Sequence, residues 1–352
     1  TETGEEGDNI LTVRPRVDIG SDWSRHALSA GAEIDAGRYL DNDSEDYDDW
    51  RIYADGRLDL PGGRVTGRAS HADQHEERTS PDDFQDGGRP AEPTEFTIDS
   101  FSLAWLYAPG RLSVEPAVSF EDFQFDDSVD TLGNTISNAD RDRSELRASV
   151  RPAYAVAEGY DVFFEAAGSM VDYDQSVDNS GFQRSSDGYE VLVGATLNPA
   201  GKTFGEAYVG YRSWSYDDPR FRDIDGLAFG VDLKWNVTGL TTFGLLGERT
   251  IESTTIESAA GIQRTALGVT ADHELLRNLV LSLALQWANE EFQGIDREDD
   301  LLTAGFSAKY MLSRRLYTYL GIEHEERDQS GTAPVEQQYD LNIVYLRLQG
   351  NL

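Results

Sequence analysis

The chain has 352 residues and no cysteine, and 65 acidic residues outnumber 30 Lys and Arg residues, giving a formal net charge of -35. The lack of cysteine excludes disulfides and thiolate metal sites. The acidic excess excludes nucleic acid as a partner and argues against docking on an anionic inner-leaflet surface. No apolar run approaches the roughly 20 residues that a membrane helix requires.

The organising signal along the chain is an alternation of apolar and polar residues with a period of two. Between Ser144 and Val156, for example, Leu146 and Val150 lie on an apolar face, while Arg147 lies on a charged one. Transmembrane barrel strands alternate in this way, and so do the strands of a soluble sandwich. The number of segments and the sorting of their connections must therefore distinguish the two.

The alternation recurs along the whole chain, in segments close to the roughly 9–11 residues that cross a bilayer at a tilt. In chain order, the predicted strands are Leu11 to Ile19, Leu28 to Ala36, Trp50 to Leu60, Val65 to His71, Phe101 to Tyr107, Leu112 to Phe120, Ser144 to Val156, Val162 to Met170, Tyr189 to Leu197, Thr203 to Ser213, Leu227 to Trp235, Thr241 to Ile251, Leu267 to Ala271, Leu279 to Trp287, Leu302 to Tyr310, Leu316 to Ile322 and Val344 to Leu352.

The connections between these segments are sorted by length. Short turns such as Pro61-Gly62-Gly63, Ala157-Glu158-Gly159 and Asn198-Pro199-Ala200-Gly201 alternate with long polar stretches. The predicted long loops are Asp41 to Asp49, Glu77 to Pro93, Asp126 to Arg141, Tyr173 to Asp187, Asp217 to Asp223, Glu290 to Asp299 and Arg327 to Gln337. Outer-membrane barrels have short periplasmic turns and long extracellular loops, whereas a sandwich has no reason to sort them.

Aromatic residues supply a third signal on the apolar face. They gather beside the short turns and again at the opposite strand ends, around a middle of Leu, Val, Ala and Ile, as in interfacial girdles. General aromatic enrichment in strands is the alternative explanation, but it predicts no preference for strand ends. The two groups are Trp105, Tyr107, Tyr154, Tyr160, Trp235 and Tyr310, and then Trp50, Phe120, Tyr189, Tyr211 and Trp287.

Together these patterns predict an all-β chain whose residues 1–352 form one transmembrane antiparallel up-and-down β-barrel. An open sheet edge in hydrocarbon is costly, so the barrel must close, and single-chain bacterial barrels have an even strand number. About seventeen segments are visible, which is odd. We therefore expect about 18 strands, one of them preceding residue 1, with about 16 as the alternative if the first segment does not pair. Residues 1–9 would then be the end of an extracellular loop.

Several short motifs resemble a family of outer-membrane β-barrel porins often encoded beside exopolysaccharide and capsule genes. The motifs are Ser21-Asp22-Trp23-Ser24-Arg25-His26-Ala27-Leu28, the region of Tyr47-Asp48, Trp235-Asn236-Val237-Thr238-Gly239-Leu240-Thr241, Arg249-Thr250-Ile251-Glu252-Ser253-Thr254, Asp272-His273-Glu274-Leu275, Arg297-Glu298-Asp299-Asp300 and the stretch Tyr339 to Leu352. The resemblance implies a Gram-negative outer-membrane location, one further strand before this region, and a link to polysaccharide export. It implies no catalytic residues.

No motif for enzymatic chemistry is present, and we expect no enzyme, no cofactor and no metal site. The sequence has no phosphate loop, nucleophile elbow or metalloprotease helix motif. His71 and His75 could bind a metal or sit beside an acid at the rim, although a solvated strand end is the simpler interpretation. The acidic run from Asp41 to Asp49 lacks the glycine and terminal glutamate of an EF-hand, so a solvated loop is the simpler interpretation.

The polar face of the strands is where function should lie. Charged rings of both signs can set a transverse field, and they can equally form salt-bridge ladders that stiffen a wide barrel with an aqueous lumen. Both interpretations stay open. The predicted pore-lining residues are Arg14, Arg16, Arg51, Arg57, Arg147, Arg151, Arg212, Lys309, Arg347, Glu33, Glu115, Glu165, Glu190, Glu206, Asp232 and Glu323.

The function that these features predict is a passive outer-membrane pore for small solutes or for an exported polysaccharide. We expect gating by the loops Glu77 to Pro93 and Asp126 to Arg141, and a preference for cations because of the acidic excess. The expected partners are outer-membrane lipid and lipopolysaccharide, and the sequence leaves the oligomeric state open. Two alternatives are a scaffold barrel that binds a partner through its acidic loops without conducting, and a soluble secreted carbohydrate-binding protein or glycosidase.

Overall fold

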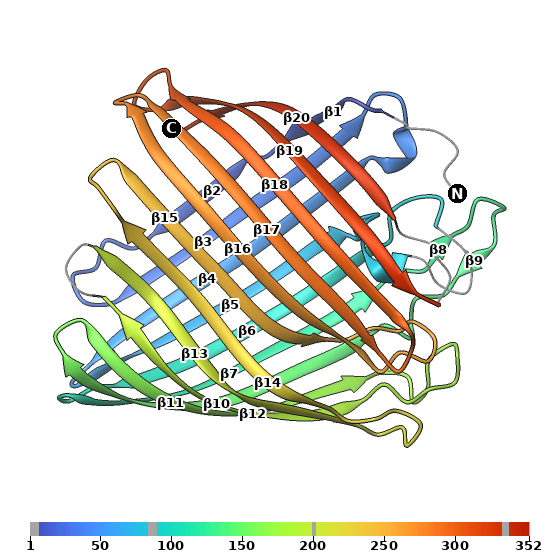
Figure 1. The fold of residues 1–352 in the computed structure, drawn as a ribbon, viewed down its shortest axis with the longest axis horizontal. Helices are drawn as coiled ribbons and strands as arrows, with labels where there is room; N and C mark the ends of the chain where they lie inside the picture. Colours follow the sequence, from blue (N-terminus) through green and yellow to red (C-terminus); the bar gives the residue numbers. More distant parts are fainter. Residues whose placement is uncertain (1–6, 84–89, 199–201, 333–337, 352) are drawn as a thin grey trace.

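The computed structural model describes residues 7–83, 90–198, 202–332 and 338–351. Eighteen strands form one antiparallel sheet that curls into a barrel (Figure 1). The elements are β1 (Ile10–Val13), β2 (Arg16–Gly20), β3 (Ala27–Tyr39), η1 (Asp43–Glu45), β4 (Tyr47–Leu60), β5 (Gly63–His75), η2 (Pro81–Asp83), β6 (Glu95–Tyr107), β7 (Leu112–Phe125), β8 (Ser128–Val129), β9 (Thr135–Ile136), β10 (Arg143–Ala157), β11 (Tyr160–Tyr173), β12 (Ser186–Leu197), β13 (Thr203–Tyr216), β14 (Ile224–Asn236), β15 (Thr241–Glu252), β16 (Gly261–Leu276), β17 (Leu279–Gln293), β18 (Arg297–Met311), β19 (Leu316–Gly331) and β20 (Tyr339–Gly350).

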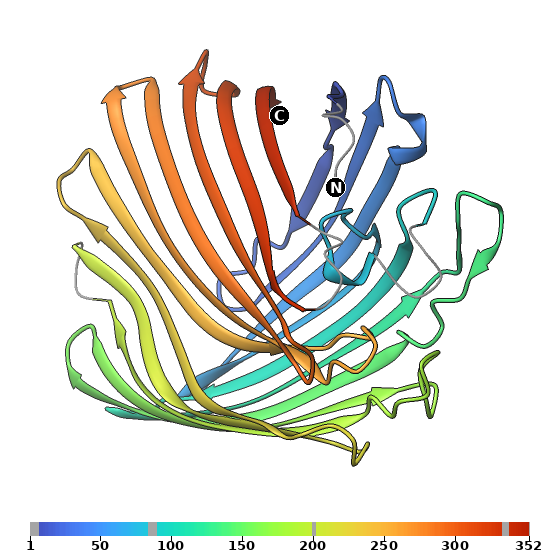
Figure 2. The same ribbon diagram turned by 45° about the vertical axis from the view of Figure 1, so that its right-hand side comes forward.

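Each long strand pairs with the next long strand along the chain, which confirms the up-and-down prediction. β7 pairs with β10, and the small hairpin of β8 and β9 lies outside the main sheet. β1 and β2 both pair with β3 and so share one place in the barrel wall; between them lies Pro15, which has no N–H to give to a ladder. β20 pairs with β19, and in Figure 2 it stands next to β1 at the rim. The strand expected before residue 1 stays a prediction.

Large apolar side chains lie on the outside of the barrel. Val193 is 57% exposed, and its ladder partners Val209 and, one strand further, Phe229 continue the apolar surface around the wall. Leu283 and Leu346 are 54% and 77% exposed. Side chains that would form the dry core of a sandwich therefore point away from one another, which contradicts the soluble alternative. Neither of the two short helices in the described residues is long or apolar enough to cross a membrane.

Aromatic side chains border this apolar belt at both strand ends. At the short-turn end, the rings of Trp105 and Tyr107 lie 5.9 Å apart and those of Trp235 and Phe243 lie 6.4 Å apart. At the opposite end, the rings of Tyr189 and Tyr211 lie 6.2 Å apart; Tyr189 is 53% exposed. Exposed rings in two bands are the arrangement that girdles at a membrane interface require.

The strands are longer than the apolar segments at the long-loop end. The prediction of a long loop from Glu290 to Asp299 is wrong, because β17 continues to Gln293 and β18 begins at Arg297. Polar residues can continue a ladder wherever backbone groups pair, so loss of apolar alternation marks the edge of the belt and not the end of the strand. β19 likewise continues to Gly331, into the loop expected from Arg327 to Gln337. Residues 333–337 of that loop, residues 84–89 of the loop expected from Glu77 to Pro93, and residues 199–201 of the turn after β12 lie outside the described residues.

Glycines on the inward face make room for aromatic rings of the neighbouring strand. Gly31 lies under the ring of Tyr53, and Gly321 lies under the ring of Tyr345; a Cβ at either glycine would collide with that ring. An aromatic side chain that covers a glycine across a strand pair shields its backbone and fixes the register. The inward rings are therefore part of the wall.

Two neighbouring residues on β17 test which face meets lipid. Leu285 lies on the outward face near the middle of the strand, and Gln286 lies on the inward face beside it. We expect Leu285→Arg to destabilise the barrel by about 2–4 kcal/mol, as charge at a bilayer midplane does, and Gln286→Arg to cost less than about 1 kcal/mol. Urea unfolding in lipid vesicles, followed by heat-modifiable gel mobility, measures both; equal costs would contradict the assignment of faces.

Candidate pore interior and mouth

All of the predicted pore-lining residues that lie in strands are on the inward face. The ladder pairs Arg151 with Glu115, Arg212 with Glu190, and Glu206 with Asp232 across neighbouring strands. Residues paired in this way point to the same side of a sheet. Arg14, between β1 and β2, reaches the same side and pairs with Asp35. The alternation alone therefore separated the two faces correctly, while the lining role itself stays a prediction.

Six of these residues form one ionic network on β10 to β13. Arg147 contacts Glu165 and Glu190 at 2.8 and 2.9 Å, and Arg151 contacts Glu165 and Glu206 at 2.7 and 2.9 Å. The Nε of Arg212 donates to Glu190 at 2.7 Å. Three arginines and three glutamates balance in charge, and the two shared carboxylates are buried. Such a network stiffens this part of the wall, as one of the two sequence interpretations proposes.

The remaining predicted residues lie outside this network. Arg16 pairs with Asp18 at 2.7 Å and lies 3.6 Å from Glu33, and Arg57 lies 3.3 Å from Asp59. The Arg51 guanidinium donates to Ser70 at 3.2 Å, and Lys309 and Arg347 lie over the ring of Tyr319. Within the described part of the chain, no ion pair is formed by Glu115, Asp232 or Glu323. These groups face the enclosed space with their charges available.

A contact between two loops crosses the mouth at the long-loop end. The Thr254 hydroxyl, between β15 and β16, donates to the Asp82 carboxylate, in η2 between β5 and β6, at 2.7 Å. Going around the wall from the first loop to the second, one crosses β6, β7 and then β10 to β15, each paired with the next. The two loops therefore start from opposite sides of the barrel. The contact must therefore pass over the interior. We call Asp82, Asp178, Arg184 and residues 254–259 the mouth bridge.

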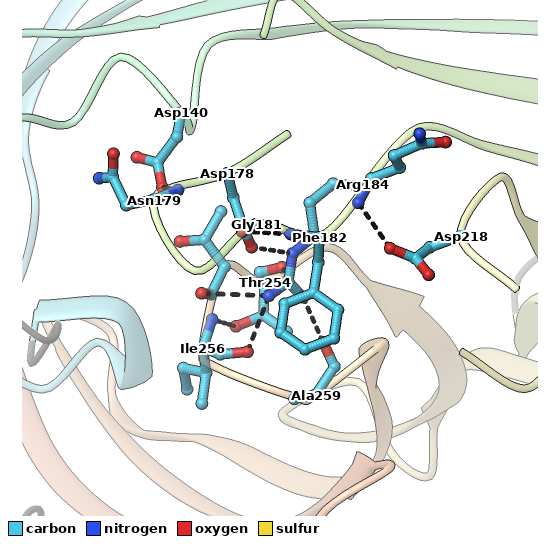
Figure 3. Close-up of polar contacts among 12 residues, drawn as sticks. Asp140, Asp178, Asn179, Gly181, Phe182, Arg184, Asp218, Thr254, Ile256 and Ala259 are labelled. Atoms are coloured by element: carbon cyan, nitrogen blue, oxygen red, sulfur yellow. Dashed lines mark hydrogen bonds and ion pairs between the residues drawn. The ribbon is translucent and has the colours of Figure 1, made fainter. Parts of the chain in front are cut away.

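Arg184 is the centre of the mouth bridge (Figure 3). Its side chain is 2% exposed, and the guanidinium pairs with Asp178 at 2.6 Å. The same side chain donates to the backbone carbonyls of Thr254, Ile256 and Ala259, so one residue of the β11–β12 loop holds the β15–β16 loop in place. Charge-assisted hydrogen bonds of a planar, five-donor guanidinium suit this role better than any other side chain.

Further contacts continue the bridge around the rim. Arg141 forms a buried bidentate pair with Glu76, which joins the β7–β10 loop to the end of β5. Next to it, the backbone N–H of Asn179 donates to Asp140 at 2.9 Å. Arg78 pairs with Glu45 at 2.8 Å and so adds the β3–β4 loop. The loops Glu77 to Pro93 and Asp126 to Arg141, which the sequence predicts as gates, both take part where the structure describes them.

An aromatic pair supports the bridge from the side. Phe182 stacks on Phe221 with ring centroids 5.0 Å apart, and Arg220 lies over Phe182. Arg220 also pairs with Asp218 and holds the pKa of that carboxyl well below its usual range. Sequence reasoning missed the β15–β16 loop and the role of Arg184. Two phenylalanines inside polar loops were the available signal, since solvated loops rarely carry them.

The histidines and the acidic run do not form a chemical centre. His71 and His75 each contact a different carboxylate, Asp99 and Asp49, both at 2.8 Å. No group of three or more His, Cys, Asp or Glu side chains that could hold a metal exists in residues 7–83, 90–198, 202–332 and 338–351. In the acidic run, Glu45 is committed to Arg78. Among the described residues, His71 and His75 do not share a carboxylate.

Arg184 should be among the most stabilising residues of the loops. Breaking a buried ion pair leaves an uncompensated charge, so we expect Arg184→Ala to lower the free energy of unfolding by about 3–5 kcal/mol. The exposed pair of Arg38 and Asp48, 2.6 Å apart, provides a matched control, and Arg38→Ala should cost no more than about 1 kcal/mol. Urea midpoints measure the two costs, and a small effect of Arg184→Ala would contradict the bridge.

Asp140 supplies a prediction of pH dependence. It is buried, one of its oxygens has no partner, and burial raises the pKa of the Asp140 carboxyl. A folded pKa above the unfolded value of about 3.9 means that ionised Asp140 destabilises the fold at neutral pH, and that this penalty disappears below the unfolded value. Asp140→Asn should therefore raise the melting temperature at pH 7, with a gain that shrinks as the pH falls towards about 4.

The control for this pH series is Asp130 in the exposed β8–β9 hairpin. Hydrogen bonds from Asn134 and neighbouring backbone N–H groups lower the pKa of Asp130, so its ionised form stabilises the fold. Asp130→Asn should thus change stability in the opposite direction to Asp140→Asn at pH 7. The same direction for both variants would contradict the account of Asp140.

Comparisons with known proteins agree with this geometry. The FrpB iron transporter of Neisseria meningitidis, in its apoprotein form, is 9% identical with a TM-score of 0.53, over 92% of this chain and 60% of that chain. The ferric enterobactin receptor PfeA of Pseudomonas aeruginosa is 8% identical with a TM-score of 0.51, over 95% of this chain and 69% of that chain. At such identities the likeness shows the fold alone. The chain spans less than two thirds of the length of the FrpB transporter.

No curated protein matches the chain. The model of one protein family, described as "Putative beta-barrel porin 2", matches residues 1–351. Membership of this family implies a membrane barrel without an enzymatic role, and it confirms the porin part of the resemblance in the sequence. The chain therefore belongs to the Putative beta-barrel porin 2 family and is a β-barrel of the outer membrane.

Proposed function

We propose that the barrel is a passive pore through which small hydrophilic solutes diffuse, with its long loops outside the cell and its short turns in the periplasm. The observation that carries this proposal is the division of the wall into an apolar outward face and an ionised inward face. Water must fill a space lined in this way, because buried charges without water or partners are too costly. A barrel of this strand number leaves room for an aqueous channel.

The mouth bridge is the element that would control entry. It joins loops from opposite sides of the rim through a few polar contacts, chiefly the one between Thr254 and Asp82. A neutral or charge-assisted hydrogen bond contributes about 0.5–3 kcal/mol net, so thermal opening of this contact is accessible. A narrow bridged mouth favours small solutes. Export of a polysaccharide would require the bridge to open fully, and we regard it as the less supported function.

The charge of the protein favours cations over anions of the same size. A net charge of -35 and acidic loops at the mouth raise the local concentration of cations. Inward carboxylates such as Asp232 and Glu323, which form no ion pair with any residue that the structure describes, extend this field into the interior.

One observation favours a second function, a scaffold barrel that does not conduct. The centre of the mouth bridge, the pair of Arg184 and Asp178, is buried, and a bridge that never opens would close the channel. The barrel would then act through its loops and the partner that they bind.

Planar-bilayer recording separates these functions. We expect the reconstituted protein to conduct and to prefer potassium over chloride. Thr254→Val removes the side-chain hydrogen bond across the mouth and leaves the longer one, 3.4 Å, from the Thr255 N–H to the same Asp82 carboxylate. It should increase the open fraction severalfold or more, because a hydrogen bond to a charged group contributes about 1.5–3 kcal/mol. Thr242→Val is the matched control: the Thr242 hydroxyl donates to Asn236 at the short-turn end, 2.8 Å away. Anion preference would contradict the pore as proposed, and silence of both the wild type and Thr254→Val would favour the scaffold.

A further inference from the structure

A hollow in the inward wall is lined mainly by small and basic side chains. One row of directly paired residues runs Arg68, Ser102, Ser119 and Arg147 across β5, β6, β7 and β10. The row below it runs Thr66, Ala104, Ala117 and Ser149. Together with Arg57 and Asp55 at one side, these residues line a cavity of about 440 Å³, which we call the serine trough.

The trough exists because its floor carries only small side chains. Ser102 and Ser119 lie between the two arginines, and Ala104 and Ala117 lie beside them, whereas elsewhere inward rings such as Tyr53 and Tyr345 cover the wall. Four small residues on neighbouring strands leave a depression that is open to the interior. The shape therefore comes directly from the sequence of β6 and β7.

The hydroxyl groups on the floor are available to a ligand. Across the part of the chain that the structure describes, the hydroxyl groups of Ser102, Ser119 and Ser149 form no hydrogen bond with another protein group. Each hydroxyl can donate one hydrogen bond and accept two. A row of free hydroxyls can replace water around a solute that is itself rich in hydroxyl groups.

The lining of the trough is basic. Arg57, Arg68 and Arg147 line it with one carboxylate, Asp55. Beyond this lining, Arg57 pairs with Asp59, and one Nη of Arg147 contacts Glu165 and Glu190. The three arginine side chains are 47%, 50% and 36% exposed, so the guanidinium groups reach enclosed water. The contact of Arg68 with Asp55 is 3.4 Å long and leaves other donors of that guanidinium uncommitted. The donors that remain on Arg68 and Arg147 face the trough and can bind an anion.

We propose that the serine trough binds short acidic oligosaccharides, with carboxylates at the arginines and hydroxyls on the serine floor. Arg68 and Arg147 are three strand spacings apart, which is about 14 Å between Cα atoms. The Arg68 guanidinium can therefore hold one carboxylate of an extended ligand in a bidentate fashion, and the Nε or Nη1 of Arg147, whose Nη2 contacts Glu165 and Glu190, can donate to a second. This proposal rests on the proposed pore, since the ligand must reach the interior, and it names the solute that the interior would select.

The trough and the cation preference act on different solutes. Small ions respond to the net field of the loops and the interior. A larger acidic sugar gains from several directed hydrogen bonds at one place, which can outweigh that field locally. The trough would then concentrate a solute that the mouth alone disfavours.

Binding is tested on the full chain in detergent by isothermal titration calorimetry, with digalacturonate as the probe and lactose as its uncharged counterpart. We expect digalacturonate to bind and lactose to bind at least tenfold more weakly. Arg68→Gln should weaken digalacturonate binding about tenfold or more, because a charge-assisted contact is lost. Arg314→Gln removes the same charge from a short turn far from the trough and should leave binding unchanged.

A second variant guards against misfolding. Ser102→Val combined with Ser119→Val keeps both arginines, removes the floor hydroxyls and should also weaken binding severalfold, with the heat-modifiable gel shift of each variant as the check of folding. The proposal is overturned if digalacturonate does not bind, if lactose binds equally well, or if Arg68→Gln behaves like Arg314→Gln. Calorimetry does not require conduction. Binding of digalacturonate by a barrel that does not conduct would contradict the proposed pore and support the serine trough.

Discussion

Every feature of this barrel depends on one constraint: backbone N–H and C=O groups in a hydrocarbon layer must find partners within the protein. Long strands in a continuous antiparallel ladder meet it, and the pleat then sends alternate side chains to lipid and to enclosed water. The exposed Val193 and its apolar ladder neighbours lie on one side of that wall, and the network around Glu190 lies on the other. Fold, location and candidate function all follow from this division.

The period of two carried most of what the sequence could predict. Parity assigns a face to each residue without knowledge of any contact, which is why Arg147, Glu206 and Arg347, far apart in the chain, were all placed inward. Parity cannot say where a polar strand ends, so the loop expected at Glu290 to Asp299 is in fact ladder. It also cannot predict Arg184, because that side chain binds backbone carbonyls that its sequence neighbours do not reveal.

Inside the wall, ionic groups have two different roles. In the network of Arg147, Arg151 and Arg212, charges balance and hold strands together. At the serine trough, small residues open a hollow and leave the guanidinium groups of Arg57 and Arg68 facing water, with Arg147 shared between the hollow and the network. A channel needs both, since a wide barrel requires stiffening while selection requires groups that a solute can reach. The mouth bridge would add control of entry at the rim.

The most direct test of the central claim uses the absence of cysteine, which lets a single introduced cysteine carry a nitroxide label. Labels at Leu285 and, separately, at Gln286 would be compared in lipid vesicles by electron paramagnetic resonance with an apolar relaxant, oxygen, and a water-soluble nickel chelate. The account predicts that the label at Leu285 is reached by oxygen and the label at Gln286 by the chelate. If both labels respond to the chelate alike, the outward face does not meet lipid and the account is contradicted.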